Sequence, residues 1–215
     1  EDTLKDYYKE LISYAPSPIK QFEREKLREL WTVDSYPCLE EFLDFYECFQ
    51  NSQDIRTAFF LILPIEEIRV KGGALVFATG HQNTYPLGIE LSDLDRENPR
   101  VKYQTTENGR WFNESGGLRS FLFTVAGWQI INLMQSVGRI KISDTSFKKK
   151  IDDELFFFTS DRTVSMQSNY RLCHDKEKNI LGCYNVLDGA LYLGSNTDEY
   201  LLDYEKKFHL EIDWL

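Results

Sequence analysis

Apolar residues near the start of the chain recur three and four positions apart, the spacing of an amphipathic helix. The pattern predicts two helices within residues 1–32. Ser17-Pro18 marks the start of the second, because serine can cap open amide groups and proline fits the first helical position. The apolar positions are Leu4, Tyr7, Tyr8, Leu11 and Ile12 in the first helix and Phe22, Leu27, Leu30 and Trp31 in the second.

A third helix is predicted after Tyr36-Pro37, with an aromatic stripe on one side and acidic residues elsewhere. No Lys or Arg occurs between Asp34 and Asp54. The stripe is expected to face the core, which leaves the carboxylates toward water. The stripe comprises Leu39, Phe42, Leu43, Tyr46 and Phe49, and the carboxylates are Asp34, Glu40, Glu41, Asp44, Glu47 and Asp54.

Short apolar runs rich in β-branched and aromatic residues follow, bounded by Pro, Gly, Asn and Asp, as in strands. Their connections contain few helix-forming residues, which favours antiparallel hairpins over βαβ units. A long amphipathic helix is predicted from about Ser115 to Met134, packed on the sheet face and tolerating Gly127 at a cost of ~1 kcal/mol relative to Ala. The strands are predicted at Thr57–Leu63, Ala74–Thr79, Leu87–Leu91 and Arg100–Gln104.

The last third of the chain predicts more strands and one further helix, begun by Thr197. The fold class is therefore α+β, with a mainly antiparallel or mixed sheet packed by several helices. No Gly/Ser/Pro-rich linker interrupts the pattern, so residues 1–215 are expected to form a single domain with a helical segment at 1–32. The predicted elements are strands Arg139–Ile142, Glu154–Thr159, Ile180–Val186, Ala190–Leu193 and Leu210–Trp214, and helix Asp198–Phe208.

The net charge is -10 and the isoelectric point is about 4.9. Binding to nucleic acid or to an anionic membrane needs clustered Lys and Arg, so neither partner is expected, whereas a basic partner complements the charge. No apolar run approaches the ~20 residues needed to cross a bilayer, and nothing is typical of a signal peptide. We expect a cytoplasmic protein.

The four cysteines, Cys38, Cys48, Cys173 and Cys183, lie among apolar neighbours and form no CxxC pair. They are predicted to be reduced core residues. The equal spacing of the two pairs suggests zinc with His174, but zinc ligands usually lie roughly two to four residues apart. We expect neither a metal nor another cofactor.

The sequence contains none of the common catalytic motifs, such as G-x-S-x-G, H-E-x-x-H, a Walker loop or G-x-G-x-x-G. His81, His174 and His209 have no informative spacing to Ser or Asp. We therefore predict no catalytic residues and no enzymatic activity. His81-Gln82-Asn83 remains open to two interpretations, a ligand or partner contact and the polar exit of a strand.

Several segments, taken in order, resemble the SUKH superfamily, which includes bacterial immunity proteins and a fungal regulator of cell-wall synthesis. The resemblance covers roughly residues 30–135. It begins with a proline-started aromatic helix and continues through a strand-to-turn step and a central strand with a polar exit. The segments are Pro37–Tyr46, Leu63–Ile68, Leu75–Ala78 with His81-Gln82-Asn83, Pro86–Ile89, Asn98–Val101, Trp111, and the helix with Leu118, Ser120, Phe121 and Leu122.

The resemblance implies an α+β fold and a protein-binding function. Immunity members of the family are expected to bind secreted or contact-delivered toxins, often basic nucleases, and an acidic protein can compete for the surface that such a toxin offers to phosphate. The alternative function is a scaffold or regulatory module without a toxin partner. The expected partner surface consists of Glu40, Glu41, Asp44 and Glu47, with His81, Gln82 and Asn83 beside them, and its alternative is an ordinary solvated helix face.

Overall fold

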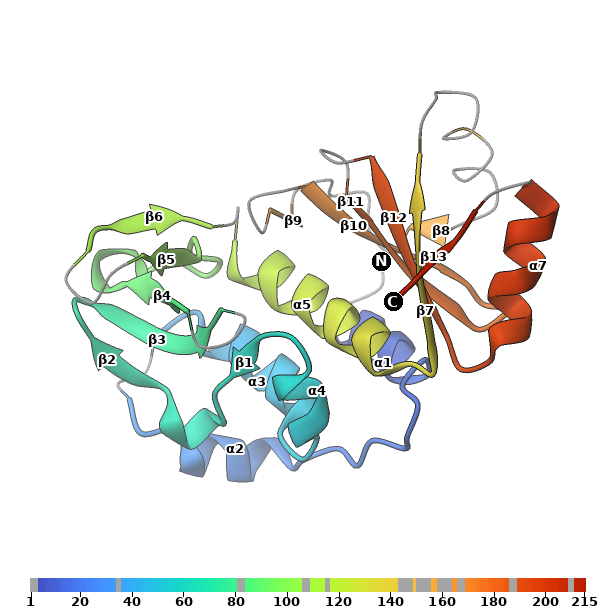
Figure 1. Cartoon of the computed structure of the whole chain (residues 1–215). Coiled ribbons are helices and arrows are strands. Elements are labelled where there is room, and N and C mark those ends of the chain that lie inside the picture. Colours follow the sequence, from blue (N-terminus) through green and yellow to red (C-terminus); the bar gives the residue numbers. More distant parts are fainter. Residues whose placement is uncertain are drawn as a thin grey trace.

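The computed structural model describes residues 4–33, 36–80, 84–105, 109–114, 117–142, 149, 156–157, 164–165, 169–185, 189–208 and 211–215. The fold is α+β, as predicted. It contains two antiparallel sheets rather than the one expected, and helix α5 (Leu118–Leu133) runs between them (Figure 1). No helix in the described part of the chain is long and apolar enough to cross a membrane.

The N-terminal helices are α1 (Leu4–Ile12) and α2 (Arg24–Leu30). The predicted start of the second helix at Ser17-Pro18 is wrong. The chain remains irregular up to Glu23, whose backbone is extended, because the Phe22 amide donates to the Glu47 carbonyl at 2.8 Å instead of entering a helix. α2 then begins with one fully buried anchor, Leu27.

Helix α3 (Leu39–Phe49) has the predicted aromatic stripe, which forms the centre of the core. Phe42, Tyr46, Phe77 and Phe121 are all fully buried, as expected. The ring of Phe42 packs edge-on against Phe77 at 5.2 Å, and Phe77 in turn packs against Phe121 at 5.9 Å. These contacts join α3 through the first sheet to α5.

The predicted strand Thr57–Leu63 is largely wrong, because α4 (Gln53–Thr57) ends where it should begin and only β1 (Leu61–Ile62) is extended. In the stretch between α4 and β1, the backbone groups form their hydrogen bonds with a side chain. The amide of Gln129 on α5 accepts from the Phe59 and Phe60 N–H groups and donates to the Phe60 carbonyl. A side chain that supplies both donor and acceptor removes the need for a neighbouring strand.

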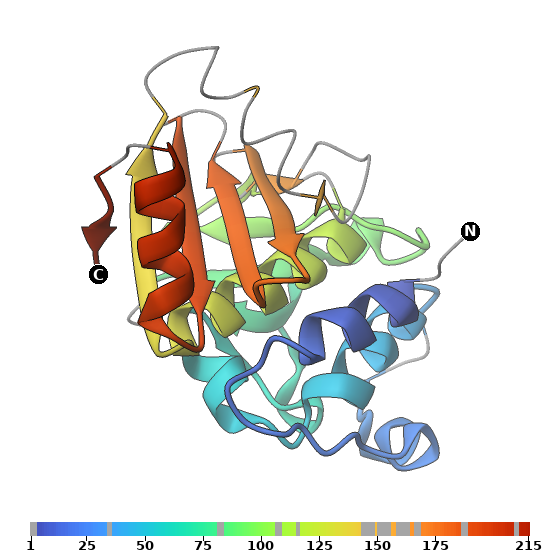
Figure 2. The same ribbon diagram turned by 90° about the vertical axis from the view of Figure 1, so that its right-hand side faces the viewer.

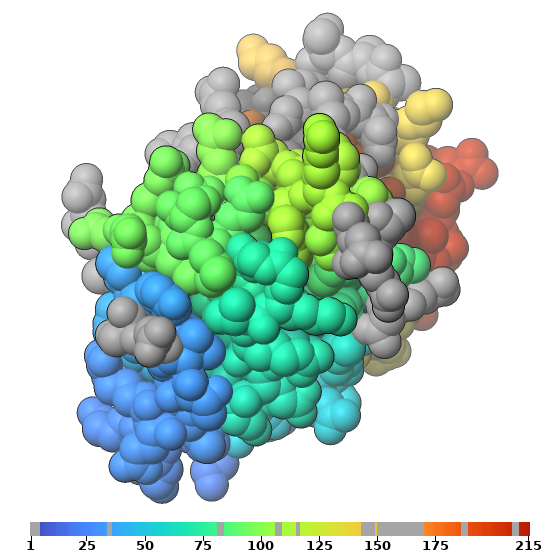
Figure 3. Space-filling view, turned by 90° about the vertical axis from the view of Figure 1, so that its left-hand side faces the viewer, coloured from blue at the N-terminus to red at the C-terminus, as the bar shows by residue number. Residues whose placement is uncertain are grey.

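The first sheet, sheet A, has the order β1-β3-β4-β5-β6, with β2 also paired to β3. All its pairs are antiparallel, with a bulge between Val76 and Ala78. Figure 3 shows its strands (green) beside the segment of α2 and α3 (blue). The further elements of this half are η1 (Ile65–Glu67), β2 (Arg69–Lys71), β3 (Ala74–Thr79), β4 (Pro86–Glu90), η3 (Leu91–Asp93), β5 (Lys102–Gln104) and β6 (Trp111–Asn113).

The second sheet, sheet B, has the order β13-β7-β12-β11-β10-β8, with β9 also paired to β10. Strand β10 was not predicted. Helix α7 packs on one face of the sheet and α5 on the other (Figure 2). The elements are β7 (Ser136–Lys141), β8 (Phe156–Phe157), β9 (Val164–Ser165), β10 (Asn169–Asp175), β11 (Ile180–Asn185), β12 (Ala190–Ser195), α7 (Asp198–Phe208) and β13 (Asp213–Trp214).

Helix α5 is buried on most of its circumference, so the expectation of a helix with one face on a single sheet is wrong. Phe121 meets sheet A, whereas a Cβ at Gly127 would overlap the Leu172 side chain of sheet B. Glycine here allows the helix to approach β10 closely. One hydrophobic cluster therefore continues from Tyr8 on α1, through both sheets, to Cys183 on β11.

The four cysteines are buried free thiols, as predicted. Burial raises the pKa of Cys38 to about 11 and that of Cys48 to about 12. Cys173 pairs with Gly182, one position from Cys183, so the two thiols lie on opposite faces of sheet B. They contribute to packing on both sides of that sheet.

Candidate functional site

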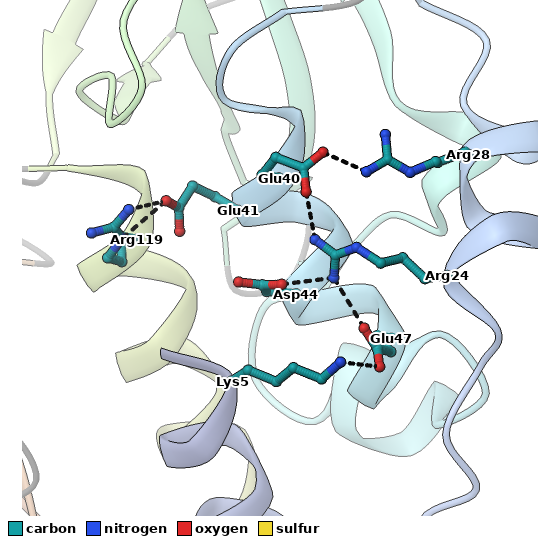
Figure 4. Close-up of polar contacts among 8 residues, drawn as sticks. All are labelled: Lys5, Arg24, Arg28, Glu40, Glu41, Asp44, Glu47 and Arg119. Carbon is teal, nitrogen blue, oxygen red and sulfur yellow. Dashed lines mark hydrogen bonds and ion pairs between the residues drawn. The ribbon is translucent and has the colours of Figure 1, made fainter. Parts of the chain in front are cut away.

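The four carboxylates predicted as a partner surface, Glu40, Glu41, Asp44 and Glu47, lie along α3. Helical spacing gathers Glu40, Asp44 and Glu47 on one side and leaves Glu41 turned toward α5. Figure 4 shows that each carboxylate meets a cation from another helix. The site is therefore an ion-pair network that joins α1, α2 and α5 to α3.

Arg24 is the centre of this network. Its guanidinium contacts Glu40 at 2.6 Å, Asp44 at 2.7 Å and Glu47 at 3.0 Å. Burial would lower the pKa of Arg24, but hydrogen bonds to the three carboxylates outweigh it and raise the pKa above its ordinary value. The ring of Trp31, just beyond α2, lies 5.6 Å from Phe42 on α3.

Two further cations complete this side of α3. Arg28 contacts Glu40 at 2.7 Å, and Lys5 contacts Glu47 at 2.6 Å. Hydrogen bonds from Arg24 and then Arg28 lower the pKa of Glu40. Burial would raise the pKa of Glu47, but Lys5 and Arg24 lower it overall. Both groups are held in the charged form.

The most deeply buried carboxylate of this network is Glu41, which is 6% exposed. It accepts hydrogen bonds from Nε of Arg119 at 2.9 Å and from a second guanidinium nitrogen of the same residue. The hydrogen bond to Glu41 raises the pKa of Arg119, against a smaller opposing effect of burial. The pair joins α3 to the first turn of α5.

The expectation of four solvent-exposed carboxylates is therefore wrong for three of them. The side chain of Glu40 is 55% exposed, but those of Asp44 and Glu47 are 23% and 13% exposed, and Glu41 is buried. Helices from distant parts of the chain cover this face. Periodicity identified the acidic side of α3 but carries no information about which cations pack on it.

His81, Gln82 and Asn83, the other predicted contact residues, lie outside the described residues, as do Asp34 and His209. The described chain resumes at Thr84, and the Gly80 amide donates to the Tyr85 carbonyl at 2.8 Å across the gap. Both interpretations of the triplet stay open.

Another titratable cluster connects the end of the α1 segment to sheet B. The Tyr14 hydroxyl lies 2.8 Å from Nδ1 of His174, and Glu10 lies 3.6 Å from that nitrogen. Burial lowers the pKa of His174, which favours the neutral ring. Cys173 points to the opposite face of β10, so Cys173 and His174 do not form a nucleophile and base pair.

Described residues form no group of three His, Cys, Asp or Glu side chains that could hold a metal ion. A groove of about 540 Å³ lies between the α1–α2 connection and the start of α4. Its polar lining includes Ser17, Ser52 and Asp54. This lining brings together no acid and base pair suited to catalysis.

No family model, curated protein or solved structure matches this chain.

Four of the exposed acidic side chains lie on α2 and η1. Glu25, Glu29, Glu66 and Glu67 are exposed. Glu66 accepts a hydrogen bond from Gln50 at 2.9 Å, and the other three form no ion pair with any described residue. The two elements lie next to each other in the fold. We call these four residues the α2–η1 acidic surface. Sequence reasoning missed it because Lys and Arg alternate with Glu along α2.

Proposed function

We propose that this chain is a non-enzymatic, protein-binding domain that acts as a bacterial immunity protein, binding a basic toxin in the cytoplasm and holding it inactive. The observation that carries the proposal is the α2–η1 acidic surface on a chain of net charge -10. Opposite charge accelerates encounter with a basic protein and orients its approach.

The ion-pair network gives this surface a fixed shape. Arg24 and Leu27 hold α2 against α3, so the glutamates on the outer side of α2 keep their positions before a partner arrives. A surface that is already ordered loses less entropy on binding. A toxin that acts on nucleic acid binds phosphate through Lys and Arg, and a fixed set of carboxylates competes for those side chains.

The resemblance to the SUKH superfamily supports the same type of function. The segments that carry it fall on α3, on sheet A with its connections, and on the start of α5. α2 and η1 pack beside α3, so the α2–η1 acidic surface borders this part of the fold.

The test is co-expression in bacteria with the toxin domain encoded next to the gene of this protein. We expect growth to be restored and the purified proteins to form a one-to-one complex. The proposal fails if the neighbouring genes encode no toxin domain, or if the wild-type chain neither binds nor protects.

A charge-reversal variant locates the surface. It should slow association at least tenfold at low salt, with a smaller difference at high salt, since salt screens exposed charges. A control with the same change in net charge, placed on and around α7, should associate much faster than the test variant. The test variant carries Glu25→Lys, Glu29→Lys, Glu66→Lys and Glu67→Lys, and the control carries Glu177→Lys, Glu199→Lys, Asp203→Lys and Glu211→Lys. Equal rates for the two would place the toxin elsewhere.

A further inference from the structure

Four aromatic rings meet where α5 crosses sheet B. The indole of Trp128 packs edge-on against Tyr192 at 4.9 Å and also meets Tyr170 at 5.8 Å and Phe59 at 5.9 Å. All four residues are only partly buried. We call them the Trp128 cluster. They come from β12, β10, α5 and the α4–β1 connection, so the fold rather than local sequence assembles this surface.

Two cations on β7 lie beside the cluster. The guanidinium of Arg139 lies over the Tyr192 ring, 5.9 Å from its centroid. Lys141, two positions further along the strand, projects from the same face and is exposed. Unlike Arg24 and Arg119, neither cation forms an ion pair with any described residue. Asp213 lies opposite Arg139 on β13 but forms no ion pair with it.

Two buried nitrogen atoms beneath this surface have no acceptor among the described residues. They are Nε of Arg139 and Nε1 of Trp128. A desolvated donor without an acceptor is costly, and partly desolvated Arg, Trp and Tyr are the residue types that contribute most at protein interfaces. The surface therefore offers positive charge and flat apolar area together.

We infer that the Trp128 cluster, with Arg139 and Lys141, binds an acidic segment of a partner protein. A carboxylate of the segment pairs with Arg139 and Lys141, and a neighbouring aromatic or aliphatic side chain packs on Trp128. The positive charge of Arg139 and Lys141 selects an acidic rather than a basic segment, since a basic one would bring cations together without a counter-charge. This surface is separate from the α2–η1 acidic surface, so the inference does not depend on the proposed function.

The test is a titration of the full-length, 15N-labelled chain with short capped peptides, followed by nuclear magnetic resonance. The acidic probe has two Asp residues flanking Phe and Leu, and the matched probes replace Asp by Lys or Phe by Ala. The indole N–H signal of Trp128, assigned with Trp128→Phe, should shift saturably with the acidic aromatic peptide. The Lys peptide should cause no saturable shift, and the Ala peptide should bind more weakly.

Arg139→Gln should weaken binding of the acidic peptide about tenfold, because it removes a charge-assisted hydrogen bond. Arg69→Gln is the matched control, since Arg69 is an exposed arginine on β2 that forms no ion pair with described residues. It should leave the affinity unchanged. Thermal unfolding establishes that both variants are folded.

Three results would overturn the inference. The first is equal binding of the Lys and Asp peptides, or an equal effect of the two arginine substitutions. The second is saturation of the same signal by acetate at the peptide concentrations, which would assign the site to free carboxylates. The third is a shift of the signal with protein concentration together with a doubled mass in sedimentation, which would make a second copy of the chain the occupant.

Discussion

Arg119, in the first turn of α5, holds the carboxylate of Glu41 on α3 through two of its guanidinium nitrogens. The pair is asymmetric, since the side chain of Glu41 is 8% exposed and that of Arg119 is 52% exposed. Loss of the arginine would leave a buried carboxylate without its counter-charge, whereas loss of the carboxylate would leave a cation that water can reach.

Arg119→Met should therefore lower the free energy of unfolding by about 2–4 kcal/mol, and Glu41→Gln by less. Denaturant unfolding of both single variants and of the double variant measures the coupling. We expect the double variant to be more stable than Arg119→Met alone, because it no longer buries an uncompensated charge. Additive effects of the two substitutions would show that the pair does not stabilise the α3–α5 contact.

Arg24 and Arg28 provide a matched comparison on α2. Arg24 contacts three carboxylates and its side chain is 24% exposed, whereas Arg28 contacts Glu40 and its side chain is 50% exposed. Arg24→Gln should cost about 1–3 kcal/mol and Arg28→Gln less than about 0.5 kcal/mol. Thermal and denaturant unfolding test the difference, which should narrow in high salt. Equal losses would argue that the network contributes no specific stability.

The same network changes what charge reversal on α3 should do. The sequence pattern alone leads one to expect that lysine at positions 40, 41, 44 and 47 would leave folding intact, because exposed charges contribute little. In the structure such a variant would place four cations against Arg24, Arg28, Arg119 and Lys5. Its loss of binding would not distinguish a partner surface from unfolding, which is why the charge-reversal experiment uses α2 and η1.

Elements with a clear local pattern could be predicted from the sequence. Helix Asp198–Phe208 and strand Ala74–Thr79 occur with the predicted bounds, and α3 lies where its aromatic stripe placed it. In each case apolar spacing alone decides which side is buried. The burial of Phe42 and Phe121 follows from the same spacing.

The remaining features depend on contacts between distant residues. The cation on Glu41 is 78 positions away, at Arg119, and no local pattern links them. Gln129 replaces a neighbouring strand for Phe59 and Phe60, so a run that favours a strand stays irregular. The two-sheet arrangement requires α5 to be buried on both sides, and its apolar residues are too evenly distributed to show this as a stripe.

A buried and an exposed phenylalanine should differ in how much they contribute to stability. Phe121 on α5 is fully buried against Phe77 of sheet A, and Phe112 on β6 is 47% exposed. Phe121→Ala should lower the free energy of unfolding by about 3–5 kcal/mol, because it removes apolar contact and leaves a cavity. Phe112→Ala should cost less than about 1 kcal/mol. Chemical denaturation of the two variants provides the measurement, and similar losses would contradict the assignment of the core.

Glu114, which follows β6, should make the stability of the fold depend on pH. The residue is 3% exposed, and burial raises the pKa of its carboxyl from 4.5 to about 7. The folded state therefore holds the proton more tightly than the unfolded state does. Stability from this group is fully present below the unfolded pKa and is lost as pH rises through the folded pKa, between about 4.5 and 7.

Glu114→Gln keeps the shape of the side chain and removes the titration. At pH 8 the variant should be more stable than the wild type by about 1–3 kcal/mol, the upper end being the full cost of ionising a group shifted this far. At pH 4 the two should be nearly equal, because a protonated Glu and a Gln are both neutral. Denaturant unfolding at a series of pH values measures the difference. Glu66→Gln, at an exposed position, is the control and should show no comparable rise. A stability difference for Glu114→Gln that stays constant from pH 4 to pH 8 would rule out this carboxyl as the source of the pH dependence.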